Sequence, residues 1–243
     1  MKQTPLWILR SMQGKIYQDE DGDTYSITLL PGMSPEEITA VAANMPKGLL
    51  PEEIIELLSY ASGLEYGWLD EIRFTDKLRG WNDRFFAHPI TLCGDGRGNS
   101  WIVDVDSEGN WGPVYFMDHD PPVLMKFADD LAGFLLLLDE DGKNRNKSFF
   151  QKLYGPIEGE IYNCGRHPVA DYHHAYDLSS VSNLPEAYRV ESLENQPPGA
   201  GFMWAPNRHE DFVARLGDRP VWIIEVKKRP DLLKRLFSLF QSL

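Results

Sequence analysis

Three short runs rich in β-branched and aromatic residues in the middle of the chain constrain its fold most strongly. They cover residues 90–93, 100–104 and 113–117, and stretches rich in Gly, Asp and Asn separate them. A period of two places successive side chains on opposite faces of a strand, and short connections favour antiparallel pairing. The runs therefore predict an antiparallel meander.

Helical signals flank the meander on both sides. Residues 34–37 combine a serine N-cap, a proline and two acids, which predicts a helix toward Asn44. Residues 51–53 repeat this signal before an apolar helical face, with Gly63 as the expected stop. A third apolar stripe over residues 127–138 predicts a helix that covers the sheet.

The ends of the chain carry weaker signals. Residues 6–30 predict a hairpin with strands at 7–9 and 25–29 and a turn at Asp19–Asp23. Further strands are expected at residues 160–162, 188–192 and 221–226. A final helix is expected over residues 230–243, with its apolar residues on one side: Leu232, Leu233, Leu236, Phe237 and Phe240.

Charge is distributed unevenly between two parts of the chain. The net charge is -13, from 37 acidic and 24 basic residues. Residues 1–143 hold 25 acidic and 11 basic side chains (-14), whereas residues 144–243 hold 12 and 13 (+1). The excess of acids excludes a general nucleic-acid binder, which needs Lys and Arg to neutralise phosphates. The charge break and the polar stretch 139–147 predict a linker between two units.

Cysteine content and hydropathy indicate a cytoplasmic protein. Cys93 and Cys164 are the only cysteines, too few for the disulfide framework of a small secreted domain. The longest apolar run, residues 134–138, is far shorter than the ~20 residues that span a bilayer. We therefore expect a soluble chain in a reducing compartment, without a signal peptide or membrane contact.

Three motifs in chain order carry a family resemblance. They are the helix from Leu50-Pro-Glu-Glu53 to Tyr60-Ala-Ser-Gly63, the strand entry Gly94–Asn99, and the strand Gly112-Pro-Val-Tyr-Phe-Met-Asp-His-Asp120. Over residues 33–141 the chain resembles the Smi/Knr-type branch of the SUKH superfamily. That family's typical strand has Trp before Asp-His, where this chain has Met117.

The resemblance implies a fold and a function class. It implies an α+β domain at 33–141, with a curved antiparallel sheet flanked by helices, preceded by the hairpin extension 1–32 and followed by an α+β unit at 142–243. It also implies binding instead of catalysis. Bacterial members are mostly immunity proteins that neutralise toxins, often nucleases, and fungal members are scaffolding regulators of cell-wall synthesis.

Several constellations permit other chemistry, but each has a simpler structural interpretation. Asp118-His119 could pair a carboxylate with a general base, yet no activated nucleophile lies nearby in the sequence. The glycines of 94–99 lack the lysine and helix of a phosphate loop, and favour a tight turn. Cys164 and His167 could bind zinc, but the adjacent His173 and His174 do not complete the site. The acids at 19–23 lack the spacing of an EF-hand calcium loop. We expect no bound metal or cofactor.

Acids near the end of the meander suggest a binding face. Alternation places Trp101, Val103 and Val105 on one face of a strand, and Ile102, Asp104 and Asp106 on the other, which we expect to face solvent. Pairing of the strands could gather the acids into one negative patch. Trp111 is either an exposed anchor within this patch or folded back over the sheet edge. The candidate partner-binding residues are Asp104, Asp106, Glu108, Trp111, Asp118 and Asp120.

An acidic binding domain suits a basic protein partner, because opposite fields accelerate association. The function expected from the sequence is an immunity protein that binds a toxin domain, with a nuclease as the expected class. The alternatives are an intracellular regulatory scaffold and, less favoured, a hydrolytic enzyme that uses the Asp118-His119 region.

Overall fold

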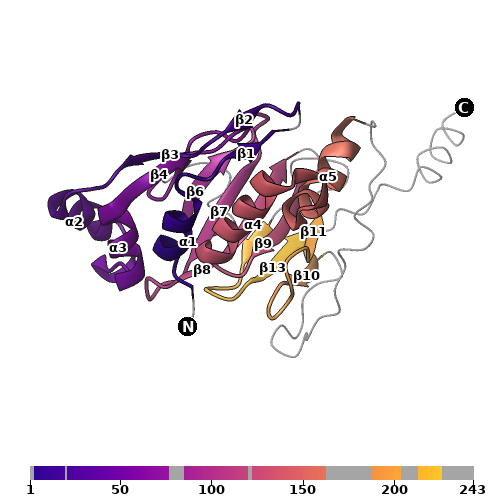
Figure 1. Cartoon of the computed structure of the whole chain (residues 1–243). Helices are drawn as coiled ribbons and strands as arrows, with labels where there is room; N and C mark the ends of the chain where they lie inside the picture. Colours follow the sequence, from indigo (N-terminus) through magenta and orange to yellow (C-terminus); the bar gives the residue numbers. More distant parts are fainter. Residues whose placement is uncertain are drawn as a thin grey trace, which may run out of the picture.

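The computed structural model describes residues 3–19, 21–76, 85–119, 122–162, 188–203 and 213–225. It is a mixed α+β protein in which every strand pairing is antiparallel. Helices lie along one side of a central sheet, and the C-terminal strands lie beside that sheet (Figure 1).

The expected meander forms the centre of the protein. It comprises β6 (His88–Gly94), β7 (Ser100–Val105) and β8 (Trp111–His119), each paired with the next. It continues into β9 (Pro122–Ala128) and then β11 (Gly201–Met203), so the sheet order is β11-β9-β8-β7-β6. The sequence did not predict β9, and Phe127 lies on this strand instead of on the following helix. Pro122 is tolerated because it is the first residue of the strand.

A smaller sheet adjoins β6. Its order is β3 (Thr28–Pro31), β4 (Ala61–Glu65) and β5 (Ile72–Arg73). The Thr91 amide of β6 donates a 2.8 Å hydrogen bond to the Asp76 carbonyl just beyond β5. Gly63, the expected helix stop, instead lies inside β4, where its Cα approaches the Ile72 carbonyl too closely for a side chain.

The N-terminal segment begins with a helix, which corrects the strand expected at 7–9. Thr4 caps α1 (Pro5–Met12) through a hydrogen bond from the Trp7 amide. The expected turn at Asp19–Asp23 is confirmed, between β1 (Tyr17–Gln18) and β2 (Thr24–Tyr25).

The remaining helices include the two helices that the sequence predicts within residues 34–60. They are α2 (Pro35–Ala43), η1 (Pro46–Gly48), α3 (Glu52–Tyr60), α4 (Leu131–Lys143), η3 (Arg145–Lys147) and α5 (Phe149–Tyr162). The strand expected at 160–162 is therefore wrong. Ser34 and Glu37 form a reciprocal capping box at the start of α2. Side chains from α1, α3, α4 and α5 pack with Trp101, Val103 and Phe116 in the main core.

The polar stretch 139–147 is not a linker. Asp139 and Asp141 are buried within α4, and Ser148 and Gln151 donate hydrogen bonds to the Asp141 carboxylate. The expected boundary at 141/142 falls inside this helix. Asp139 and Asp141 are polar residues that can be buried in this stretch, because each carboxylate accepts hydrogen bonds from side chains of the protein.

The C-terminal strands cover the second face of the central sheet. β10 (Tyr188–Ser192), β13 (Val221–Glu225) and β12 (Val213–Arg215) form a separate sheet in that order. Trp222 and Ile224 pack with Ile102, Tyr115 and Met117 in a second core. Strands β10, β11, β12 and β13 are thus integrated with the preceding part of the protein. The expected helix at 230–243 lies outside the described residues.

Candidate functional site

Asp104 is not on a solvent-exposed face. The predicted alternation along β7 is confirmed, but the face that carries Ile102 and Asp104 is covered by the C-terminal strands. Arg215 of β12 donates hydrogen bonds of 2.5 and 2.6 Å to the two carboxylate oxygens of Asp104. Burial raises the pKa of Asp104, and the Arg215 guanidinium counteracts part of this effect. Asp104 is therefore a structural residue that joins two sheets.

Asp106 and Glu108 lie in the turn between β7 and β8. The Asp106 carboxylate accepts hydrogen bonds from the amides of Glu108 and Asn110, both at 2.9 Å. Gly109 adopts a φ of 88°, which favours glycine. The Glu108 side chain is exposed and pairs with Lys47 of η1. Asp106 therefore shapes the turn, and Glu108 remains accessible beside η1.

Similar turns occur at residues 95–99 and 19–23. Asp95 accepts hydrogen bonds from the amides of Arg97 and Asn99, and Asp19 does the same for Asp21 and Asp23. Their fourth residues, Gly98 and Gly22, have φ of 92° and 89°. This confirms the tight turn with glycines at positive φ that was expected at residues 94–99 and the hairpin turn that was expected at residues 19–23.

The other expected binding residues do not join Asp106 and Glu108. Trp111 pairs with Val105 at one end of the β7–β8 hairpin, whereas Met117 pairs with Ser100 at the other. Asp118 is thus roughly 23 Å along the strand from Trp111, and it is completely buried. Asp120 lies outside the described residues. The expected single acidic patch is therefore wrong, because the antiparallel register separates its members.

Trp111 folds back over the sheet edge, which is the second of the two expected alternatives. It is half-buried and packs against the main core. It lines a small crevice with Pro5, Ile54 and Leu131, which belong to three different helices. The ring therefore serves as packing between the helical layer and β8.

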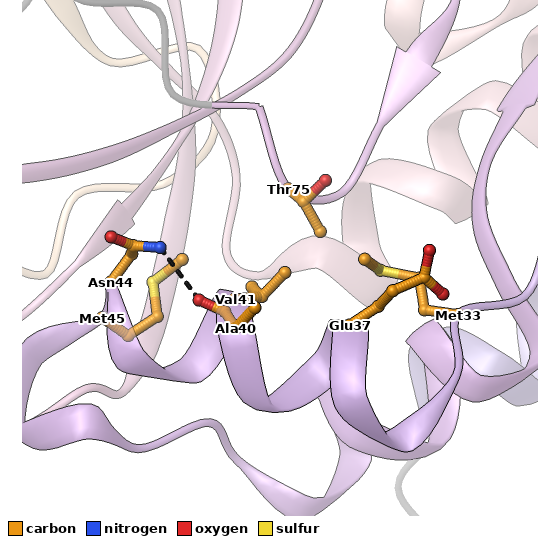
Figure 2. Close-up of a pocket in the computed structure, with 7 residues that line it drawn as sticks. All are labelled: Met33, Glu37, Ala40, Val41, Asn44, Met45 and Thr75. Carbon is orange, nitrogen blue, oxygen red and sulfur yellow. Dashed lines mark hydrogen bonds between the residues drawn. The ribbon is translucent and has the colours of Figure 1, made fainter.

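An open groove lies along α2, away from the expected patch. It has a volume of about 510 Å³ and is lined by Met33, Glu37, Ala40, Val41, Asn44, Met45 and Thr75. Met33 and Met45 lie at the two ends of the groove, Ala40 and Val41 lie between them, and Thr75 lies opposite the helix (Figure 2). Its volume is within the range of ordinary ligand pockets.

The lining of the groove is mainly apolar and adaptable. Methionine side chains are flexible and polarisable, so they accommodate differently shaped apolar partners. The polar groups of the groove are partly engaged within the protein: Glu37 accepts a 2.7 Å hydrogen bond from the Ser34 amide, and the Asn44 side chain donates one of 2.9 Å to the Ala40 carbonyl. The groove therefore suits apolar side chains better than a small polar substrate.

The helical segment that carries this groove is acidic, and Glu37 lines the groove itself. Residues 33–60 contain five acids (Glu36, Glu37, Glu52, Glu53 and Glu56) and one base, Lys47, for a net charge of -4. Lys47 is already paired with Glu108. A partner with apolar side chains and positive charge would complement both features.

The described residues contain no cluster of His, Cys, Asp and Glu that could hold a metal ion. Burial raises the pKa of the Cys93 thiol, which keeps it protonated and unreactive. The side chain of His119 and the candidate metal ligands Cys164, His167, His173 and His174 lie outside the residues described. None of the described helices is both long and apolar enough to cross a membrane.

Sequence reasoning missed the groove residues. Ile38, Val41, Ala42 and Met45 form a helical stripe, which a sequence pattern assigns wholly to the core. In the structure Ile38 is the one buried residue of α2, while Val41 is partly exposed in the groove. The methionines at both ends of α2 were the available signal.

Comparisons with protein-family models, curated proteins and solved structures gave no match.

Proposed function

We propose that the chain is a non-catalytic protein-binding domain, and that it acts as an immunity protein that neutralises a basic toxin by direct binding. The observation that carries this proposal is the open, methionine-lined groove on α2, in a helical segment (residues 33–60) with a net charge of -4. A toxin is proposed as the partner because the chain resembles Smi/Knr-type proteins, and a nuclease is the expected class of toxin. The groove replaces the expected acidic patch as the binding site.

The two features have separate physical roles. The net charge of -13 raises the rate of encounter with a basic partner, an effect that salt weakens. The groove supplies affinity, because apolar side chains that enter it are removed from water. Glu108 pairs with Lys47, which is the one base of residues 33–60.

The test uses two variants on the same helix. Val41→Asp places a charge in the groove, whereas Thr39→Asp adds the same charge at an exposed position outside it. A basic partner is first identified by capture with the full chain, and its binding is then measured by calorimetry. We expect Val41→Asp to weaken binding at least ~10-fold, equivalent to about 1.4 kcal/mol, and to abolish protection of cells that express the partner. Thr39→Asp should retain both.

Equal binding by the two variants would exclude the groove as the site. A captured partner that is not toxic to cells would contradict the immunity role while leaving groove binding intact.

A further inference from the structure

The two methionines of the α2 groove differ in accessibility. Met33 and Met45 lie at its two ends, and the side chains of both point toward the middle of the groove (Figure 2). Met45 is 6% exposed and belongs to the main core, whereas Met33 is partly exposed and packs against that core. A small reagent that enters the groove therefore reaches Met33 more easily than Met45.

Every other methionine that the structure describes is buried. Met12, Met117 and Met125 are completely inaccessible, and Met203 is nearly so. Met1 lies outside the described residues. Within the described part of the chain, Met33 is thus the one methionine that is not buried, and it lines an open groove of about 510 Å³.

A thioether that a hydroperoxide can reach is a site of reversible oxidation. With hydrogen peroxide, the O–O bond breaks, one oxygen atom bonds to the methionine sulfur and the other leaves as water. The sulfur loses two electrons and the peroxide gains them. The product is methionine sulfoxide, which methionine sulfoxide reductases convert back to methionine. The reaction requires contact with the sulfur, so burial slows it.

Oxidation of Met33 would change the chemistry of the groove. The thioether is apolar and flexible, whereas the sulfoxide is a polar group that binds water. An apolar side chain that enters the groove would remove this water. Burial of a polar group without a replacement hydrogen bond is unfavourable, so the free energy of binding would be less favourable after oxidation.

We propose that Met33 is a redox-modification site, at which hydroperoxides form a sulfoxide that lowers the affinity of the α2 groove for an apolar partner. The effect on affinity rests on the proposed function, whereas the selective oxidation of Met33 does not require a partner.

The first experiment measures the modification in the full chain. The protein is treated with dilute hydrogen peroxide, either folded or in concentrated urea, and each methionine is followed by peptide mass spectrometry. We expect Met33 to oxidise at least roughly tenfold faster than Met45 in the folded protein and at a similar rate in urea, because burial protects Met45 only while the chain is folded. The reductases should reverse the change at Met33, and circular dichroism should show an unchanged fold.

The second experiment measures the effect on the partner captured for the binding assay. Each protein is compared before and after treatment of that protein alone, so that only the change on oxidation is read. Treatment should weaken binding by at least roughly tenfold for the unmodified chain and for Met45→Leu, but should not change the affinity of Met33→Leu. The reductases should restore the binding of the unmodified chain.

Equal rates of oxidation at Met33 and Met45 in the folded protein would overturn the proposal. Loss of the folded circular dichroism signal on oxidation would also overturn it, because the sulfoxide would then act on the fold instead of on the groove. Failure of the proposed function gives a different result: binding that Val41→Asp leaves intact excludes the groove as the site, whatever the oxidation rates. If Val41→Asp abolishes binding and oxidation of Met33 does not weaken it, the redox effect alone is refuted.

Discussion

Asp139 is a buried carboxylate whose ionisation contributes to stability. It accepts hydrogen bonds from Lys15 at 2.8 and 2.9 Å, from the Tyr17 hydroxyl at 2.8 Å and from Lys143 at 2.5 Å. Burial acts to raise its pKa, but the hydrogen bonds from Lys143, Lys15 and Tyr17 together outweigh burial and lower it. Because the folded-state pKa lies below the unfolded value, the unfolded chain binds the additional proton as the pH falls.

We therefore expect Asp139→Asn to lose about 1–3 kcal/mol of unfolding free energy at pH 7. The stabilisation by Asp139 is complete above its unfolded pKa of about 4 and is lost as the pH falls through the lower folded pKa. The difference between the two proteins should thus narrow below about pH 4. Denaturant titrations at several pH values measure this difference in unfolding free energy. Glu140→Gln, at the adjacent exposed position, is the control. A difference that does not depend on pH would contradict this account.

At the scale of elements, patterns that repeat within one segment were predictable. The serine N-cap and proline at the start of α2 and the alternation of β7 depend on neighbours in the sequence, and both occur as predicted. The same N-cap and proline signal is present at Thr4-Pro5, so the sequence does contain a local signal for α1, which replaces the strand expected at residues 7–9.

Elements defined by distant partners were not predictable. All seven residues of β9 are buried, so the strand shows no alternation, and its identity depends on pairing with β8 and β11. The groove was missed for the same reason. Whether Val41 faces the core or a groove depends on how α2 lies against Thr75, which local pattern does not specify.

The ion pair between Asp104 and Arg215 should stabilise the packing of the two sheets. Both side chains are nearly inaccessible, at 8% and 7% exposure, and Arg215 also lies 5.6 Å from the Trp222 ring centroid. Asp104→Asn leaves a buried guanidinium without its counter-charge. We expect a loss of about 3–5 kcal/mol in unfolding free energy.

A second arginine pair in the same region provides the control. Arg219 contacts Glu194 with similar bidentate geometry, but these side chains are 48% and 36% exposed. Glu194→Gln should cost no more than about 1 kcal/mol. Equal losses in the two variants, measured by urea denaturation, would show that burial does not determine the strength of the pair.

At the scale of the whole molecule, the two cores share the central sheet. Tyr115 and Phe116 are adjacent on β8, yet Tyr115 packs in the second core and Phe116 in the main core. The C-terminal strands therefore bury the face that carries Ile102, Met117 and Leu124. A domain that ended at the expected boundary would expose this apolar face, and β9 would lose its partner β11.

The last prediction is that the described fold unfolds as one unit. The full chain should give a single transition by both circular dichroism and tryptophan fluorescence. A variant that ends at Lys147 should aggregate or lose cooperative unfolding, because the uncovered second face is apolar and continuous with the main sheet. A variant that ends at Val226 retains β10, β12 and β13, and should keep the single transition. Limited proteolysis gives an independent measurement, since cleavage within 139–143 requires opening of the end of α4, which holds the buried Asp139 and Asp141. A soluble, cooperatively folded fragment 1–147 would instead establish two independent domains and restore the boundary predicted from charge.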